Sequence, residues 1–200
     1  MNLTEYKQVE KLTYREYCDY LQNKYGIGLK DYMTKSWNKN TRATRTSEGL
    51  VIHHKYEDCA IMLSNEKYAR KNPFEWQLAK NLIYCDYLEH LFLHILICEN
   101  PSIDKNENEI VGIGGIINFL VPELNDFYSG WEANVLWKKK CLERIRDDKE
   151  VYLILLKRFK NNCKTYPYYT EDCLFTSFNE EYGLWTREQN ENLFWQIDEL

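Results

Sequence analysis

Apolar and polar residues follow two different periods along this chain, and these periods predict where helices and strands lie. Apolar and aromatic positions between residues 4 and 25 recur roughly every 3.6 residues, which predicts a helix. These positions are Tyr14, Tyr17, Cys18, Leu21 and Tyr25. The pattern ends at two glycines, and the polar residues 31–48 that follow are rich in Thr, Ser and Asn, which predicts a loop.

Two short apolar runs predict a pair of β-strands that are far apart in the sequence. The runs are GLVIHH at 49–54 and NLIYC at 81–85, and both are rich in residues that favour strands. The segment between them, 55–80, is polar and mixed, and it predicts short helices near 65–70 and 73–80. We therefore expect a two-stranded hairpin that carries a long insertion.

The second half of the chain is predicted to be mainly helical. Residues 86–98 predict a helix, because Asp86 is a favourable N-cap residue and Glu89 stands three positions later. The apolar run 111–124 contains glycines but lacks the GxxxxGK[ST] pattern of a phosphate-binding loop, so close helix packing is the better interpretation. Residues 131–160 also predict a helix, first charged and then apolar.

These elements predict an α+β fold that is predominantly helical and is built around a small hairpin–helix module. We expect one domain with three sections, since 200 residues suit a single core. The sections are an N-terminal helix with a polar loop (1–48), the hairpin–helix module (49–98, with its insertion at 55–80) and a helical C-terminal region (99–200).

Composition narrows the class of protein. The chain has no run of 18 apolar residues, which argues against a membrane span, and its polar, acid-containing start is unlike a signal peptide. Its seven cysteines form no CxxC pair, which argues against a cysteine zinc site or a disulfide framework and indicates reduced thiols in a cytoplasm. The abundance of Asn, Lys, Ile and Tyr is associated with bacterial or phage coding sequences.

Charge is distributed unevenly. The net charge of −5 does not suggest a nucleic-acid-binding protein. However, six bases face two acids between residues 30 and 55, a net of +4, whereas eight acids face one base between 171 and 200, a net of −7. The basic stretch can contact phosphates or form a solvated loop. The acidic, aromatic tail is interpreted as a packed helix with an acidic outer face, and a dimer contact or a mask for the basic surface stays open.

The histidines carry the clearest chemical signal. The chain has only four, and His53–His54 ends the first predicted strand while His90 and His94 lie four apart in the helix after the second. Residues i and i+4 project from one face of a helix, and neutral imidazole is a common metal ligand. Two helical ligands and one from the strand make a three-ligand site with an open position. The other strand histidine points to the opposite side of the pleat and is available as a base.

The order HH…N…H…H resembles that of the HNH nucleases with the ββα-metal fold, and most closely their colicin-type DNase variant. The resemblance covers about residues 49–98. It implies that His53 and His90 bind one divalent metal ion (Mg, Mn, Ni or Zn), with His94 as third ligand or phosphate contact. It also implies that His54 is the general base and that Asn81 braces the hairpin. The implied function is a metal-dependent endonuclease that cleaves DNA, in restriction, phage defence or a mobile element.

The flanking residues add candidate contacts and alternatives. Lys35, Lys39, Arg42 and Arg45 precede the first histidine pair and are candidate phosphate contacts. Glu57 follows that pair closely, either as a partner that orients a ligand imidazole or as part of a surface loop, the interpretation that the sequence favours. A non-catalytic interaction or regulatory protein that retains an HNH frame, and an RNA-cleaving nuclease, are the alternative functions.

Overall fold

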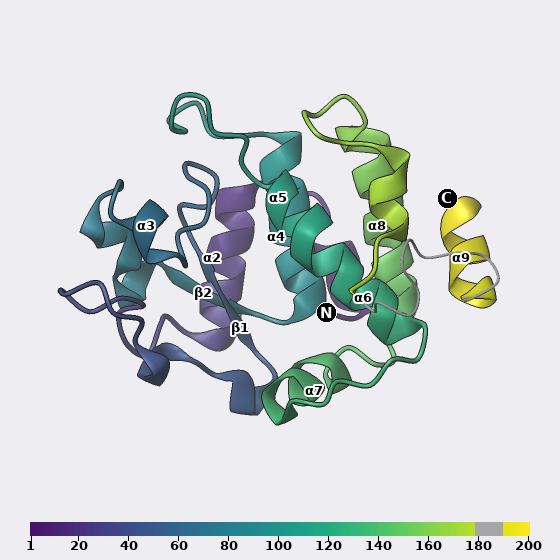
Figure 1. The fold of residues 1–200 in the computed structure, drawn as a ribbon, viewed down its shortest axis with the longest axis horizontal. Helices are drawn as coiled ribbons and strands as arrows, with labels where there is room; N and C mark the ends of the chain where they lie inside the picture. Colours follow the sequence, from purple (N-terminus) through teal and green to yellow (C-terminus); the bar gives the residue numbers. More distant parts are fainter. Residues whose placement is uncertain (179–189) are drawn as a thin grey trace.

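The computed structural model describes residues 1–178 and 190–200, and helices dominate it (Figure 1). The longer elements are α1 (Leu3–Val9), α2 (Tyr14–Tyr25), β1 (Val51–His54), β2 (Leu82–Cys85), α4 (Tyr87–Glu99), α6 (Val121–Tyr128), α7 (Leu136–Glu143), α8 (Lys149–Cys163) and α9 (Glu191–Asp198). The expectation of a helix-rich α+β fold with one small hairpin is confirmed. Within the described residues, no helix is both long and apolar enough to cross a membrane.

The N-terminal helix differs from the prediction of one continuous helix over residues 4–25. It is two helices, α1 and α2, because Thr13 begins a new one. The Thr13 hydroxyl accepts a hydrogen bond from the backbone N–H of Glu16, and the Glu16 carboxylate accepts one from the backbone N–H of Thr13. This reciprocal capping box provides hydrogen-bond partners for backbone N–H groups at the start of α2, as expected where a new helix begins.

The two strands pair as expected, antiparallel and in a register that sets Val51 opposite Cys85 and His54 opposite Leu82. Residues 55–80 are therefore an insertion between them. The insertion contains α3 (Glu66–Ala69), which Asn65 caps, and two short 3-10 turns, η3 (Phe74–Gln77) and η4 (Ala79–Asn81). The helix expected over 73–80 is thus broken, because Leu78 adopts an extended conformation between the two turns.

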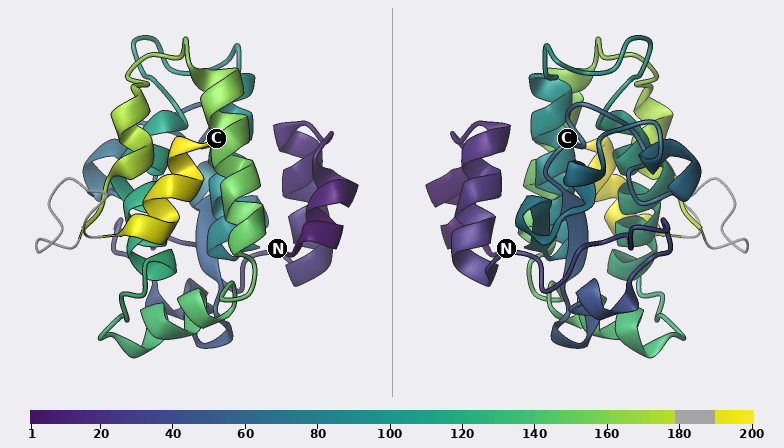
Figure 2. Two further views of the ribbon diagram at one scale, coloured as in Figure 1. Left: turned by 90° about the vertical axis from the view of Figure 1, so that its right-hand side faces the viewer. Right: turned by 90° about the vertical axis from the view of Figure 1, so that its left-hand side faces the viewer.

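Helix α4 lies at the centre of the molecule (Figures 1 and 2). It begins as predicted, with a reciprocal capping box between Asp86 and Glu89. It contacts α2, both strands and α8, and most of its side chains are buried on all sides, as expected of a helix in the middle of a core. The lysine ammonium of Lys24 approaches the buried Glu89 carboxylate to 2.6 Å and ties α2 to its first turn.

A glycine-containing segment runs in front of α4 in Figure 1. It comprises α5 (Ile113–Gly115), a π-helical stretch η5 (Ile116–Leu120) and α6. The segment packs on α4, which confirms the expectation that the glycines serve close packing. Gly112 has a φ of 80°, in the left-handed region, and a Cβ there would lie 2.8 Å from the Cys98 sulfur.

The helix predicted over 131–160 is also two helices, α7 and α8. They are separated by turns in which the backbone N–H of Ile145 bonds to Leu142 and that of Asp148 bonds to Ile145. Ile145 is buried in the core, so the turn between the two helices places an apolar side chain inside the protein. In the tail, α9 buries Leu193 and Ile197 as expected of a packed helix. Three of the eight acids of the tail and Trp185 fall within residues 179–189, which lie outside the described residues.

Candidate metal centre

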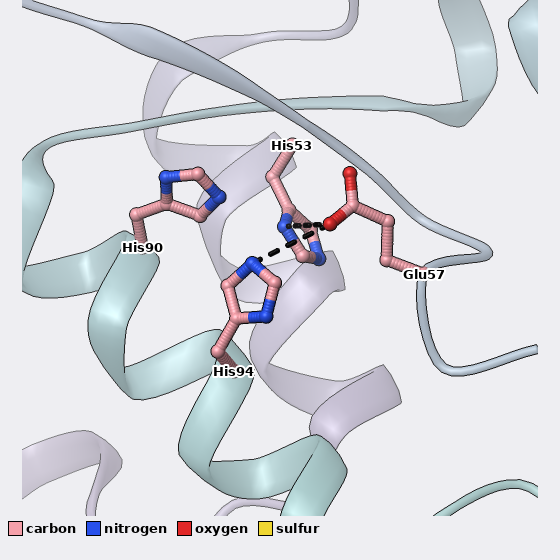
Figure 3. A group of neighbouring side chains, drawn as sticks. All are labelled: His53, Glu57, His90 and His94. Carbon is pink, nitrogen blue, oxygen red and sulfur yellow. Dashed lines mark ion pairs between the residues drawn. The ribbon is translucent and has the colours of Figure 1, made fainter. Parts of the chain in front are cut away.

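Three imidazoles and one carboxylate meet beside the hairpin (Figure 3). They belong to His53 on β1, Glu57 in the turn after β1, and His90 and His94 on α4. One ligand atom from each residue lies within 4.8 Å of all the others. The centroids of the three imidazole rings are 4.9 to 5.1 Å apart. The three histidines that the sequence assigns to a metal are thus brought together.

Local geometry explains this convergence. His90 and His94 are one helical turn apart, so their side chains share the face of α4 that looks toward β1. The pleat of β1 directs the side chain of His53 toward α4 and that of His54 to the other side of the hairpin. One helix and one strand therefore supply three ligands without any unusual backbone conformation.

Tyr14 on α2 orients His53. Its hydroxyl lies 2.8 Å from Nε2 of His53, and it also lies within 3.2 Å of the carbonyl oxygen of Lys55. When the tyrosine donates to that carbonyl, it accepts a hydrogen bond from Nε2–H of His53, and the lone pair of His53 is then on Nδ1. Such a partner on the far side of a ligand imidazole fixes its tautomer and orientation.

The glycine segment orients His94. Nδ1 of His94 lies 2.9 Å from the carbonyl oxygen of Gly112, and because a carbonyl can only accept, Nδ1 carries the proton and Nε2 the lone pair. Gly115 packs against the imidazole so closely that a Cβ at this position would lie 2.6 Å from Nδ1 and 2.7 Å from Nε2. A side chain at residue 115 would therefore displace the ring.

Glu57 is the member of the cluster that the sequence did not assign as a ligand. One carboxylate oxygen lies 3.4 Å from Nδ1 of His53 and 3.4 Å from Nε2 of His94. The other oxygen lies 3.3 Å from Nδ1 of His54. The side chain is only 17% exposed, so the favoured interpretation of a surface loop is wrong. The available signal was its spacing, since a turn directly after a strand can return residue i+4 to the side chain of residue i.

Burial and mutual repulsion set the charge of the cluster. Burial lowers the pKa of His53 to about 3 and also lowers the pKa of His94. The pKa of His90 falls well below its usual value, first through burial and then through its histidine neighbours. For Glu57, burial acts to raise the pKa, but His53, His54 and His94 outweigh it and hold the pKa well below its usual value. Near pH 7 the imidazoles are therefore neutral and the carboxylate is ionised, the forms that bind metal.

The donor set fits a transition-metal ion. In the part of the chain that the structure describes, Nδ1 of the fully buried His53 has no hydrogen-bond partner, although it points into the cluster. An orphaned buried nitrogen is costly unless something absent from the coordinates satisfies it. Imidazole nitrogens with one carboxylate oxygen suit Zn or Ni better than a hard cation such as Mg that prefers oxygen ligands. The four residues can therefore hold a metal ion.

His54 and Asn81, the predicted base and brace, lie outside this cluster. The His54 ring packs against Tyr32 with centroids 4.5 Å apart, and Nε2 lies 3.3 Å from the side-chain oxygen of Gln77. Its contact with the cluster is made by Nδ1, which lies 3.3 Å from a Glu57 oxygen. The side chain of Asn81 donates to the carbonyl of Glu75, and its own carbonyl accepts from the backbone of Lys55, so it braces the two ends of the insertion.

The predicted phosphate contacts lie on the loop that covers the His54 side of the hairpin. Lys35 and Arg42 are exposed. Lys39 is exposed as well, with its ammonium 5.0 Å from the ring centre of Tyr32. Arg45 is held by two bonds to Glu48 of the 3-10 turn η2 (Thr46–Glu48), 2.8 and 2.5 Å long, and by the carbonyl of Tyr25. Arg45 thus has a structural role whatever else it binds.

A deep cleft of about 1020 Å³ opens onto the cluster. Glu57, His90 and His94 line it, whereas His53 and His54 do not. Its other walls include residues of the insertion and of the segment α5–η5–α6, together with Trp137, Lys138 and Phe178. Three of the four candidate ligands therefore face this cleft.

No family model, no curated protein and no solved structure matches this chain. The resemblance to HNH nucleases consequently rests on the residues themselves, and the function must be argued from the geometry of the site.

Proposed function

We propose that this chain is a metal-dependent endonuclease that hydrolyses phosphodiester bonds in DNA. The observation that supports it most strongly is the meeting of His53 with His90 and His94, where an antiparallel hairpin runs into the following helix. Strand, strand and helix stand in the chain order that the resemblance implies. Glu57 adds a carboxylate to the three expected ligands.

The metal ion, when bound, would act as a Lewis acid that offsets charge on the scissile phosphate and the leaving oxygen. The protein's own residues prepare that site. Tyr14 and the Gly112 carbonyl present the lone pairs of His53 and His94, and α4 presents His90 to the cleft. In this proposal His54 takes the proton from the attacking water.

His54 requires a rearrangement for that role. Its Nδ1 faces a Glu57 oxygen and its Nε2 faces the Gln77 oxygen, both at 3.3 Å. Two acceptors are satisfied together only when both ring nitrogens carry protons. To accept a proton at Nε2, His54 must therefore separate from Gln77 and release the proton that it holds there to solvent before the attack. Glu57, which faces the cleft, is the rival for the same role.

The proposal is tested with chelator-stripped protein, supercoiled plasmid and each of Mg, Mn, Ni and Zn. Three variants separate the roles: His90→Ala removes a ligand, His54→Ala removes the proposed base, and Glu57→Gln removes the rival charge. Glu66→Gln, a half-exposed residue paired with Arg70, is the matched control. We expect metal-dependent nicking by the wild type and the control, loss of metal binding and nicking in His90→Ala, and loss of nicking alone in His54→Ala.

Other outcomes redirect the assignment. Cleavage that survives in His54→Ala but is lost in Glu57→Gln, while the Glu57→Gln protein still binds the metal, moves the base to Glu57. Cleavage of RNA with intact plasmid changes the substrate. A protein that binds metal and cleaves neither nucleic acid contradicts the nuclease and supports a non-catalytic interaction or regulatory role.

A further inference from the structure

The cleft above the metal centre has apolar walls. Their side chains come from Ile61 in the insertion, from Ile113, Ile117 and Leu120 opposite, and from Trp137 and Phe178. Several large apolar side chains at this cleft are exposed, among them Phe119 at 61%, Phe178 at 50% and Trp137 at 43%. Large exposed apolar patches are uncommon on soluble proteins, and where they occur they often mark a binding site.

One wall is formed by an unusual backbone. Residues Ile116–Leu120 form the π-helical stretch η5, and four of its five residues line the cleft. π-helical turns are rare and occur frequently at functional sites. Here the wider turn directs Ile117 and Leu120 toward the same space as His90 and His94.

The cleft also contains an unsatisfied acceptor far from bulk water. Glu123, on α6, lines the cleft, and its side chain is only 7% exposed. One carboxylate oxygen pairs with the ammonium of Lys138 at 2.7 Å. The other oxygen is buried and has no hydrogen-bond partner among the described residues. A buried carboxylate oxygen requires a donor, and a bound ligand can supply one.

The described walls of the cleft lack the row of cations that would hold a long polyanion along them, although a single phosphate group can still meet the candidate ligands His90 and His94. Of the described residues that line it, Lys138 is the one cation, and Glu123 already neutralises it. A nucleic acid backbone needs several lysine or arginine side chains along its path that are not already paired with acids. The cleft volume of about 1020 Å³ instead matches that of small-molecule sites, which are mostly apolar with a few polar groups.

We infer that this cleft binds a small amphiphilic anion, with a carboxylate or phosphate head toward His90 and His94 and an aliphatic body between Ile117 and the insertion. A donor group on that body, such as a hydroxyl, meets the free oxygen of Glu123. The head is anionic because it joins a metal centre whose open side faces the cleft. The inference uses the metal centre and does not require nuclease activity.

The test measures binding to the Co²⁺-loaded full chain, by visible absorption and by calorimetry, with acetate, octanoate, 8-hydroxyoctanoate and octyl phosphate. Octanoate should bind at least about 100-fold more tightly than acetate, because each buried methylene contributes roughly fourfold. Octyl phosphate distinguishes a phosphate head from a carboxylate head. The 8-hydroxyl should leave affinity unchanged or raise it, since Glu123 accepts from it; a tenfold loss would remove Glu123 from the ligand site.

Two matched substitutions locate the binding. Ile117→Asp places a charge in the apolar wall and should abolish the preference for octanoate while the acetate response persists, which shows that the protein is folded and loaded. Ile103→Asp makes the same change at a residue that is 98% exposed and should have no effect. Equal affinity for acetate and octanoate in the wild type, or no response to either, would overturn the inference. Plasmid cleavage is not a readout here, so failure of the nuclease proposal is recognised separately.

Discussion

His53 and His54 are neighbours on β1 and are equally buried, at 0% and 1% exposure, yet they belong to different environments. His53 faces α4, and its Nδ1, which has no hydrogen-bond partner among the described residues, points into the group of side chains that could hold a metal ion. His54 faces the basic loop, and both its ring nitrogens lie 3.3 Å from acceptor oxygens. The pleat of a single strand places one imidazole in the candidate metal site and the other in a hydrogen-bonded support.

Glu57 connects the two environments. One of its oxygens faces His53 and His94, and the other faces His54. The comparison therefore teaches that the hairpin does not simply separate ligand from base. A single carboxylate couples them, so a change of charge at His54 is felt at the metal centre.

The two sides of the hairpin should differ most in the effect of a substitution on metal affinity. His90→Ala removes one nitrogen from the donor set, and we expect metal affinity to fall by on the order of 1000-fold, because binding energy is shared among few ligands. His54→Ala should leave affinity within about tenfold, as expected for a residue that acts through a ligand. Calorimetric titration with Zn²⁺ measures both. An equal loss of Zn²⁺ affinity in the two variants would contradict the assignment of His90 to the metal site and of His54 to a supporting role.

The glycine segment offers a finer test of the α4 side. Gly115→Ala should weaken metal binding by about 100-fold, because the new methyl group forces the His94 ring from its position. Gly114→Ala is the matched control, since its Cβ would come no closer than 3.7 Å to a neighbour, the side chain of Asn118. If both alanine variants bind Zn²⁺ as the wild type does, His94 is not held by this packing.

In the metal-free protein, the free energy of unfolding should fall at acid pH because His53 is buried in its neutral form. Burial gives this residue a folded-state pKa of about 3, below the ordinary value near 6.5 in the unfolded chain. The unfolded state thus binds more protons below pH 6.5, and the stability due to neutral His53 is lost as pH falls toward 3. At pH 5 the loss is about 2 kcal/mol. Urea unfolding of wild type and His53→Gln between pH 7 and 5 measures it, and parallel pH profiles would refute the assignment.

Tyr14→Phe is the smallest predicted effect. It removes the hydroxyl that orients His53 but keeps the ring, so metal affinity should drop about tenfold. Tyr20→Phe, at a second tyrosine of α2, removes a hydroxyl that donates to Glu5 of α1 and should leave metal affinity unchanged. Zn²⁺ competition with a chromophoric chelator resolves a change of this size. An unaffected Tyr14→Phe protein would mean that packing alone orients His53.

The sequence allowed the hairpin, the helix after it and the meeting of three histidines to be predicted, because these features depend on local rules. Pleat alternation, the i and i+4 spacing and the Asp86–Glu89 capping box all act within a few residues. The same rule at Thr13 and Glu16 would have revealed the break between α1 and α2. The Thr13–Glu16 pair indicates a helix start, but the apolar period over residues 4–25 led to the prediction of one continuous helix.

The remaining parts of the site could not be predicted because their partners are distant in the chain. Tyr14 meets His53 across 39 positions, and the Gly112 carbonyl meets His94 across 18. No periodicity records which tyrosine or which glycine turn will pack against a given imidazole. The cleft is a property of how the insertion and η5 oppose each other across α4, and it emerges only from the assembled fold.

The central claim is that His53, Glu57, His90 and His94 together bind one metal ion. The most direct test is a crystal grown with Co²⁺, with anomalous difference density recorded at the cobalt absorption edge. We predict one peak about 2 Å from Nδ1 of His53, Nε2 of His94 and a ring nitrogen of His90. An empty cluster in a cobalt-saturated crystal, or cobalt bound by other residues instead, would contradict it.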